Sequence, residues 1–252
     1  MNKIIFITGA TSGFGKAIAE KFAANHWNVI ITGRRKERLE LIAADLKKSF
    51  NINTLTLAFD VQDKDAVFTA INSLPEEWKQ IDVLVNNAGL ALGRDSFENA
   101  DLNDWETMLD TNVKGMMYVT RAVLPYMIEK KGGHIINLGS IAAKEVYQLG
   151  NGYCSSKHAV DALSKSMRID LLHHKIKVTA IHPGAAETEF SIVRFKGDES
   201  KAAAVYKGFT PLYANDIADT IFYCATLPQH VCINELIIMP TAQANANLFY
   251  KE

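Results

Sequence analysis

The chain has 252 residues, 48% of them hydrophobic, which suits one large α/β domain or two small ones. It carries 27 lysines and arginines against 28 acidic residues, so the formal net charge of −1 favours neither a nucleic acid nor a membrane surface as a partner. No apolar run reaches the roughly 20 residues that a membrane-spanning helix needs, and the N-terminus lacks the pattern of a signal peptide.

The three cysteines are Cys154, Cys224 and Cys232, an odd number with no metal-ligand spacing. Thiols stay reduced in the cytoplasm, whereas secreted proteins pair them as disulfides. We therefore expect a cytoplasmic protein with free thiols and without a metal site.

The first predicted element is a strand at 4–7, where four apolar residues in a row indicate a parallel strand buried on both faces. A glycine turn with the spacing GxxxGxG follows, and then a predicted helix at 16–24. A strand, a glycine turn and a helix N-terminus together present backbone N–H groups to a pyrophosphate. We predict that this turn binds a dinucleotide cofactor. Its predicted contacts are Gly9, Thr11, Ser12, Gly13, Phe14 and Gly15.

A second strand is predicted at 29–32, followed by Gly33 and then by two arginines at the start of a helix at 36–50. At this place an NAD site needs a carboxylate for the ribose 2′-hydroxyl, and an NADP site needs a cation for the 2′-phosphate. No acidic residue stands between the end of this strand and Glu37. We therefore predict that Arg34 and Arg35 bind the 2′-phosphate of NADP.

The middle of the chain continues to alternate strands with helices. Strands are predicted at 55–59, ending at Asp60 and Val61, and at 81–85, with a helix at 63–73 between them. A long helical pattern then covers about 102–130 and contains Asn112. Asparagine is a poor residue in the middle of a helix, so its presence there needs a functional reason.

A fifth strand is predicted at 134–138, ending beside Ser140, and a helix runs from Tyr153 to about residue 174. Tyr153 and Lys157 lie four residues apart, on one face of that helix. Opposite charges about 4 Å apart attract by roughly 4 kcal/mol at an effective dielectric near 20. An ammonium beside the phenol would therefore lower its pKa from about 10 toward about 7, where acid–base catalysis works best. Taken alone, the pair also fits an ordinary amphipathic helix.

The last part of the chain contains a sixth strand at 176–181, a helix at 215–226 and a short strand at 235–239. The mixed, charged segment 185–212 is interpreted as an insertion over the carboxyl edge of the sheet. There are no internal repeats and no linker. We predict one domain over 1–252, an α/β fold of Rossmann type with a doubly wound parallel sheet of about seven strands and helices on both faces.

Taken together, these motifs resemble a classical short-chain dehydrogenase/reductase over essentially the whole chain. They are the glycine turn at 8–15, the Asn-Asn-Ala-Gly stretch at 86–89, Ser140, the Tyr153-xxx-Lys157 pair and Pro183-Gly184. Further stretches resemble the branch of NADP-dependent 3-hydroxy acid (serine/allo-threonine) dehydrogenases. They lie at 33–35, 87–93, 104–106, 188–191 and 193–197.

The resemblance implies a catalytic tetrad of Asn112, Ser140, Tyr153 and Lys157. Tyr153 would exchange the proton with the substrate oxygen, which Ser140 would hydrogen-bond. Lys157 would lower the Tyr153 pKa and hold the nicotinamide ribose, and Asn112 would hold a water that links Lys157 to solvent. The remaining cofactor contacts implied are Asp60 and Val61 at the adenine, Thr188 at the carboxamide, and Asn87, Ala88, Gly89, Pro183 and Gly184.

One departure concerns the pair that follows Pro183-Gly184. The branch usually carries Leu-Val there, and this chain carries Ala185-Ala186. These residues would lie near the nicotinamide and the substrate, so the difference implies an altered or larger pocket. It bears on the preferred substrate and leaves the general reaction unchanged.

A small hydroxy acid needs a cation or several donors for its carboxylate. The candidates near the pocket are Lys144, Arg194 and Lys196. We choose Arg194, whose planar fork matches a carboxylate in two bonds, with Gln148 as a second donor. A surface arginine on a mobile loop is the alternative interpretation.

Three functions are compatible with the sequence. The first is an NADP-dependent dehydrogenase of small 3-hydroxy acids, which in reverse reduces the oxo acid or semialdehyde. The second is a carbonyl reductase for a bulkier ketone, sugar or acyl substrate, and segment 185–212 would decide between the two. The third is a non-catalytic dinucleotide sensor, which should have lost tetrad members, whereas all four are present here.

The two helical patterns at 102–130 and 153–174 carry apolar residues beyond one face. Such a helix expects a partner on more than one side. Similar family members pair these helices in dimers and usually in tetramers, so we expect a homotetramer. The apolar residues in question are Met116, Met117, Tyr118, Val160 and Leu163.

Overall fold

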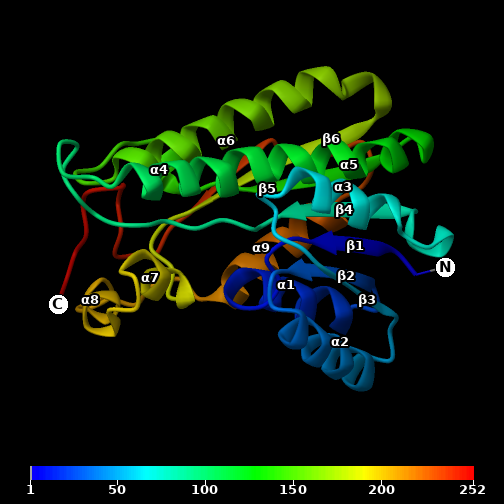
Figure 1. Ribbon diagram of the computed structural model, residues 1–252, viewed down its shortest axis with the longest axis horizontal. Coiled ribbons are helices and arrows are strands. Elements are labelled where there is room, and N and C mark those ends of the chain that lie inside the picture. Colours follow the sequence, from blue (N-terminus) through cyan, green and yellow to red (C-terminus); the bar gives the residue numbers. More distant parts are fainter. Residues whose placement is uncertain (1) are drawn as a thin grey trace.

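The computed structural model describes residues 2–252, which contain a single sheet of seven strands (Figure 1). The strands are β1 (Ile4–Ile7), β2 (Asn28–Gly33), β3 (Thr54–Ala58), β4 (Ile81–Asn86), β5 (Gly133–Leu138), β6 (Ile176–Pro183) and β7 (Glu235–Ile238). Their order is β3-β2-β1-β4-β5-β6-β7, and every neighbouring pair runs parallel. The predicted α/β fold with a seven-stranded parallel sheet is confirmed.

Helices cover both faces of the sheet. They are α1 (Gly13–Ala24), α2 (Lys36–Phe50), α3 (Lys64–Asn72), α4 (Leu102–Leu109), α5 (Met116–Glu129), α6 (Asn151–Asp170), α7 (Glu189–Arg194), α8 (Glu199–Ala204) and α9 (Ala214–Thr226). Buried residues of α1, α2 and α9 form one core with the sheet, and those of α3 and α5 form a second core on the other face. Figure 1 shows α4, α5 and α6 on the face opposite α1, α2 and α9.

The first strand shows why the sequence gives a sheet buried on both faces. All four residues of β1 are buried. Successive side chains of a strand point to opposite faces, and accordingly Ile5 and Ile7 belong to one core while Ile4 and Phe6 belong to the other. An uninterrupted apolar run is therefore the pattern that this position requires.

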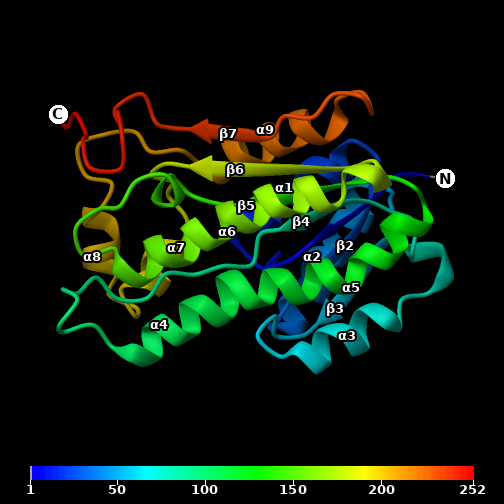
Figure 2. The same cartoon turned by 90° about the horizontal axis from the view of Figure 1, so that it is seen from above.

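The strand order places the site. The chain builds outward from β1 to β3 and then returns to place β4 on the other side of β1. In sheets of this kind, ligands bind outside the carboxyl ends of the strands where the order reverses. In Figure 2 the arrowheads of β6 and β7 point to the end of the molecule where α7, α8 and the C-terminus lie.

The predicted helix at 102–130 is interrupted, which corrects the sequence interpretation. Asp110–Gly115 form a π-helical turn between α4 and α5, and Asn112 lies within it. The Asn112 amide clamps the main chain of Leu90, accepting from its N–H at 2.8 Å and donating to its carbonyl at 2.9 Å. Such π turns are frequent at functional sites. The asparagine that fits a regular helix poorly is therefore explained by a local break in the helix.

Other predicted bounds shift by a few residues. The Tyr153 helix begins at Asn151 and ends at Asp170, followed by a 3₁₀ turn at Leu172–His174. Within residues 2–252, none of the helices combines the length and the apolar character that a membrane span requires.

Candidate active site

A large cavity lies at the carboxyl edge of the sheet and has a volume of about 970 Å³. Its lining comes from the turn between β1 and α1, the carboxyl ends of β2 to β6, the start of α6, the segment containing α7 and α8, and the C-terminal residues after β7. Tyr153, Lys157 and Ser140 all line it. The cavity has room for a dinucleotide and a small substrate together.

Three of the four predicted tetrad residues, Ser140, Tyr153 and Lys157, line this cavity. The fourth, Asn112, is buried beside it, and its amide bonds to Leu90, which also lines the cavity. Tyr153 and Lys157 project from α6 and are buried. Lys157 Nζ donates to the Leu138 carbonyl at 2.8 Å and lies 5.9 Å from the centre of the Tyr153 ring. A Cβ placed on Gly89 would lie 3.1 Å from Asn112 Oδ1 and 3.6 Å from Lys157 Nζ. The absence of a side chain at Gly89 therefore lets both groups lie close to the main chain there.

Burial is the main influence on the pKa values of Lys157 and Tyr153. It lowers the pKa of Lys157 from 10.5 to about 8. It also raises the pKa of Tyr153 well above the ordinary value of 10.0, an effect reinforced by Tyr147 and opposed by the Ser140 side chain and by Arg194. The chain by itself therefore holds Tyr153 as the neutral phenol. This direction is opposite to the one expected from the Tyr-Lys spacing, because burial of the phenol is the largest effect on its pKa.

Ser140 lies directly beyond the end of β5. Its hydroxyl caps the following 3₁₀ turn, Ile141–Ala143, by accepting the N–H of Ala142 at 3.1 Å. The same side chain lies beside Tyr153, where it lowers the tyrosine pKa against the effect of burial. The two hydroxyls that the sequence assigns to the substrate oxygen are thus neighbours.

The turn between β1 and α1 fits a pyrophosphate. Gly9 and Gly13 have φ values of +66° and +51°, which only glycine adopts readily. A Cβ on Gly15 would lie 2.4 Å from the Gly9 carbonyl oxygen. No side chain caps the first N–H groups of α1, so they remain available to an anion. Thr8 Oγ1 accepts the N–H groups of Asn87 and Ala88, each at 2.9 Å, and so joins this turn to the end of β4.

The two arginines after β2 border the same cavity. Arg35 donates to Thr11 Oγ1 at 2.7 Å, and Arg34 lies 3.6 Å from Asp60. Glu189 of α7 lies 3.8 Å from Arg35 and 3.6 Å from Arg38, all between exposed side chains. This group of arginines suits a phosphate. In the described part of the chain, Asp60 and Glu189 are the only carboxylates that pair with it.

The remaining predicted cofactor residues also line the cavity. Thr188 caps α7 through its hydroxyl, and its Cβ would lie 3.4 Å from a Cβ placed on Gly13. The others are Ser12, Phe14, Val61, Pro183 and Gly184. A bulkier residue at position 184 would meet Gln243 Oε1 at 2.4 Å, so Gly184 is required by close packing.

Arg194 is the one candidate anchor whose charge points into the cavity. Its guanidinium donates to the Tyr147 hydroxyl at 2.9 Å and lies 5.5 Å from the centre of the Tyr153 ring. Lys144 is engaged instead by Asp161 and Glu235, at 2.8 and 2.7 Å. Lys196 pairs with Asp104 at 2.9 Å, and Gln148 lines the cavity.

Several site residues escaped the sequence analysis. Tyr147 holds Arg194, and Phe190 packs edge-on against Tyr153 with ring centres 5.6 Å apart. Gln243, in the segment after β7, accepts the N–H of Ala185 at 2.7 Å. No periodicity marks these loop positions, although Phe190 belongs to a stretch that already carried the family resemblance.

Comparisons with known proteins agree with this geometry. Residues 3–198 match the short chain dehydrogenase family. The chain is 48% identical to an NADP-dependent 3-hydroxy acid dehydrogenase of Salmonella typhi, covering 97% of this chain and 98% of that one. It is also 48% identical to sulfoacetaldehyde reductase 2 of Chromohalobacter salexigens, covering 97% and 96%. The closed form of a serine dehydrogenase complexed with NADP+ superposes with a TM-score of 0.92 at 45% identity, covering 99% of both chains. The chain therefore belongs to the short chain dehydrogenase family.

Proposed function

We propose that this protein is an NADP-dependent oxidoreductase that transfers a hydride between nicotinamide and a small hydroxy acid of the 3-hydroxy acid, serine or allo-threonine type. In the reverse direction it reduces the oxo acid or semialdehyde. The observation that carries the proposal is the Arg194 guanidinium beside Tyr153 within the cavity. It puts a carboxylate-binding group next to the proton donor. The named relatives act in the same chemical range.

The positions of the chain's own residues support the following proposed roles. NADP supplies the hydride acceptor or donor and, when oxidised, a positive charge that lowers the Tyr153 pKa. Tyr153 takes the alcohol proton during oxidation and returns it to the carbonyl during reduction. Ser140 hydrogen-bonds the same substrate oxygen as charge develops on it. Lys157 stabilises the phenolate, and Asn112 holds the water that links Lys157 to solvent.

We propose NADP rather than NAD because Arg34 and Arg35 follow β2 where an NAD site would carry an acid. Their guanidinium groups lie beside the turn that fits the pyrophosphate. Asp60 and Glu189 are their present counter-charges, and both are exposed enough to yield to a phosphate. The NADP-dependent relatives support the same cofactor.

The acid group of the substrate is assigned to Arg194, with Gln148 as a second donor. Lys144 and Lys196 already have carboxylate partners, which makes them poor anchors. A planar guanidinium binds a sulfonate as well as a carboxylate, and two relatives at 48% and 47% identity are sulfoacetaldehyde reductases. Reduction of sulfoacetaldehyde is therefore the second candidate function.

We further propose a cytoplasmic homotetramer built from one domain over 1–252, with 185–212 as its substrate loop. Cys154, Cys224 and Cys232 are all free thiols, which supports a reducing compartment. Met117 is 42% exposed on α5 and Ile169 is 75% exposed on α6, which supports contacts between subunits. Met116 and Val160 were expected in such contacts, but both are buried within the chain and need no partner.

The test is an assay of a substrate panel, in which turnover is measured by the absorbance of NADPH or NADH. Serine, allo-threonine, other 3-hydroxy acids, sulfoacetaldehyde and neutral ketones are assayed with NADP(H) and with NAD(H). The proposal expects turnover of at least one hydroxy acid with NADP+ and much weaker turnover with NAD+. Faster turnover of bulky neutral ketones would favour the alternative of a general carbonyl reductase.

A further inference from the structure

His182 lies behind Ser140 and has no role in the mechanism described above. It belongs to β6, and its side chain is fully buried. The backbone ladder between β5 and β6 ends where the Gly139 N–H donates to the Ile181 carbonyl at 2.7 Å. The next main-chain groups are those of Ser140, and His182 Nδ1 lies 3.4 Å from the Ser140 nitrogen and 3.2 Å from its carbonyl oxygen.

The ring lies flush against the chain at this point. A Cβ on Gly139 would be only 2.3 Å from His182 Nδ1, so any other residue at 139 would push the imidazole away. The imidazole therefore takes the place of the next main-chain hydrogen-bond partner between β5 and β6. It controls the direction of the main chain from which the Ser140 hydroxyl projects.

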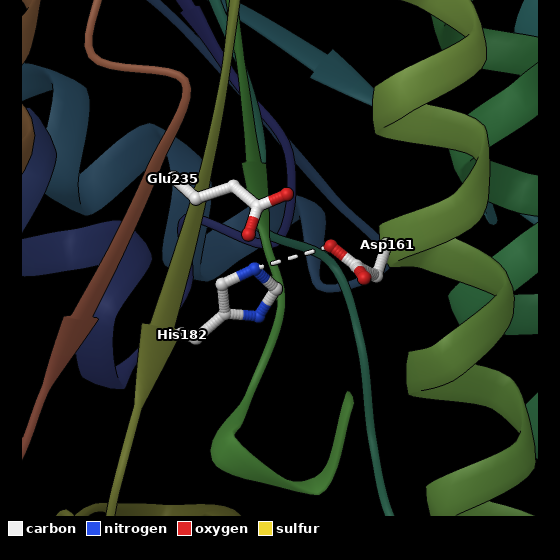
Figure 3. A group of neighbouring side chains, drawn as sticks. All are labelled: Asp161, His182 and Glu235. Carbon is white, nitrogen blue, oxygen red and sulfur yellow. Dashed lines mark ion pairs between the residues drawn. The ribbon is translucent and has the colours of Figure 1, made fainter. Parts of the chain in front are cut away.

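The other side of the ring faces a charged cluster, shown in Figure 3. Within residues 2–252, His182 Nε2 makes no hydrogen bond, and Asp161 Oδ1 lies 3.5 Å from it. Glu235 converges on the same place from β7. Lys144 donates to both carboxylates, at 2.8 Å to Asp161 and 2.7 Å to Glu235. The lysine already fills the position that a metal ion would take.

The cluster is joined to the catalytic residues through the chain. Asp161 follows Lys157 by four residues on α6, so it lies one turn further along the same helix face. Lys144 follows Ser140 by four residues, at the far end of the 3₁₀ turn. The segment from Ser140 to Lys144 is therefore fastened at both ends, by His182 at one and by the carboxylates at the other.

Only one proton arrangement uses both nitrogens of the ring. Burial, with a further contribution from Lys144, lowers the pKa of His182 to about 4 against the opposing effect of Asp161, so the ring is neutral near pH 7. A proton on Nε2 points at the Asp161 carboxylate and leaves Nδ1 free to accept the Ser140 N–H. A proton on Nδ1 would donate to the Ser140 carbonyl oxygen at 3.2 Å, but it would aim a bare Nε2 at a carboxylate, which is repulsive.

We infer that His182 is a positioning residue for Ser140: Asp161 selects the tautomer protonated at Nε2, whose Nδ1 accepts the Ser140 N–H and orients the serine hydroxyl toward the substrate oxygen. The inference rests on the proposed role of Ser140. Misplacing a reacting group by about 1 Å costs up to about 10²-fold in rate. Loss of His182 should therefore lower kcat by roughly 10- to 100-fold. Cofactor affinity should change by less than about twofold, because His182 does not line the cavity.

The first test is the tautomer in the intact wild-type protein, read by nitrogen-15 NMR at pH 7. We expect His182 to be protonated at Nε2, and to switch to Nδ1 in Asp161→Asn, whose amide donates to Nε2. Protonation at Nδ1 in the wild type would overturn the inference. This measurement needs no substrate, so it stands apart from the substrate proposal.

The second test is kinetic and uses any substrate that the wild type turns over. His182→Leu removes the acceptor for Ser140 N–H, whereas the side-chain oxygen of His182→Asn can take the place of Nδ1. We expect the large loss of kcat in the first and recovery to within about threefold of wild type in the second.

The matched control is His134→Leu. His134 is equally buried, on the neighbouring strand β5, but bonds to Thr179 Oγ1 at 2.7 Å and does not border the cavity. The His134→Leu variant should be less stable than the wild type but keep the wild-type kcat. Equal kcat losses in the His182→Leu and His134→Leu variants would mean that His182 only supports the fold, and the inference would be wrong.

Discussion

The two sides of the cavity are built in different ways. The proposed catalytic wall consists of Asn112 in the π-helical turn, Ser140 after the end of β5, and Tyr153 and Lys157 on α6. Asn112, Ser140 and Lys157 each hydrogen-bond to neighbouring groups of the fold. The cover consists of 185–212 and 240–252, which form two six-residue helices and irregular chain. Our proposal therefore places the chemistry on the rigid side and substrate selection on the adaptable side.

The cover is fastened by a few polar bonds. The Tyr206 hydroxyl donates to the Ala186 carbonyl at 2.8 Å, and the Glu252 N–H donates to the Gly208 carbonyl at 2.8 Å. Its helix α7 meets the arginines of the cofactor site at Glu189 and reaches Tyr147 through Arg194 at the other end. A cover of this kind accepts changes such as Ala185-Ala186 without disturbing the tetrad.

The largest effect is expected on the catalytic wall. Tyr153→Phe removes only the transferred proton, so turnover should fall by about 10²- to 10⁴-fold while NADPH binding remains nearly intact. Steady-state rates and cofactor titration by fluorescence measure the two quantities. A variant that retains a third of the wild-type rate would contradict the assigned role of the phenol.

The cofactor site should respond strongly but selectively. Loss of charged hydrogen bonds costs roughly 1.5–3 kcal/mol, or about 10- to 150-fold in affinity. The double variant Arg34→Ala, Arg35→Ala should bind NADPH more weakly by this factor, whereas NADH affinity changes little. The NADH titration is the internal control, and an equal loss for both cofactors would show that the arginines do not read the 2′-phosphate.

The buried lysine predicts a conflict between activity and stability. Burial lowers the Lys157 pKa from 10.5 to about 8, which corresponds to about 3 kcal/mol of lost folding stability below pH 8. The lost hydrogen bond to Leu138 offsets about 1 kcal/mol. Lys157→Met should therefore be inactive, yet about 2 kcal/mol more stable than wild type at pH 7.

The sign of its pH dependence follows from the same pKa. Between pH 8 and 10.5 the unfolded chain binds a proton that the folded chain releases, so wild-type stability rises with pH relative to Lys157→Met. Urea unfolding of both proteins without cofactor, at pH 7 and pH 10, measures the difference. A variant less stable than wild type at pH 7 would disprove the cost assigned to burial.

The smallest effect is expected on the exposed cover. Glu189→Gln removes the carboxylate that lies near Arg35 and Arg38 and would compete with the 2′-phosphate. Exposed pairs contribute little, so NADPH should bind only about two- to fivefold more tightly. Glu187→Gln, an exposed carboxylate two residues earlier, is the matched control and should leave NADPH affinity unchanged. An identical response of the two variants would indicate a general charge effect.

The same contrast explains what the sequence could predict. Strands such as β1 are buried on both faces, and their apolar runs can be read directly. The Tyr153–Lys157 pair and the glycine turn are local patterns with fixed spacing. The predicted direction of the Tyr153 pKa was wrong for the chain by itself, because the pKa depends mainly on how deeply folding buries the phenol, which the Tyr-Lys spacing does not show.

The cover could be located in the sequence but not described. Arg194 was one of three candidate cations near the pocket, and what separates it from Lys144 and Lys196 is that these two pair with carboxylates in the folded chain. Gln243 and Tyr147 come from loops that meet only after folding. Contacts of this kind between distant irregular segments leave no periodic signal in the chain.

The division of labour between wall and cover is tested most directly by one kinetic comparison. Wild type, Tyr153→Phe and Arg194→Ala are assayed with a 3-hydroxy acid and with its neutral methyl ester. We expect Tyr153→Phe to lower kcat for both substrates alike. Arg194→Ala should raise KM for the acid by roughly 10- to 150-fold and leave KM for the ester nearly unchanged. If Arg194→Ala impairs both substrates equally, Arg194 is structural and the cover does not select the acid.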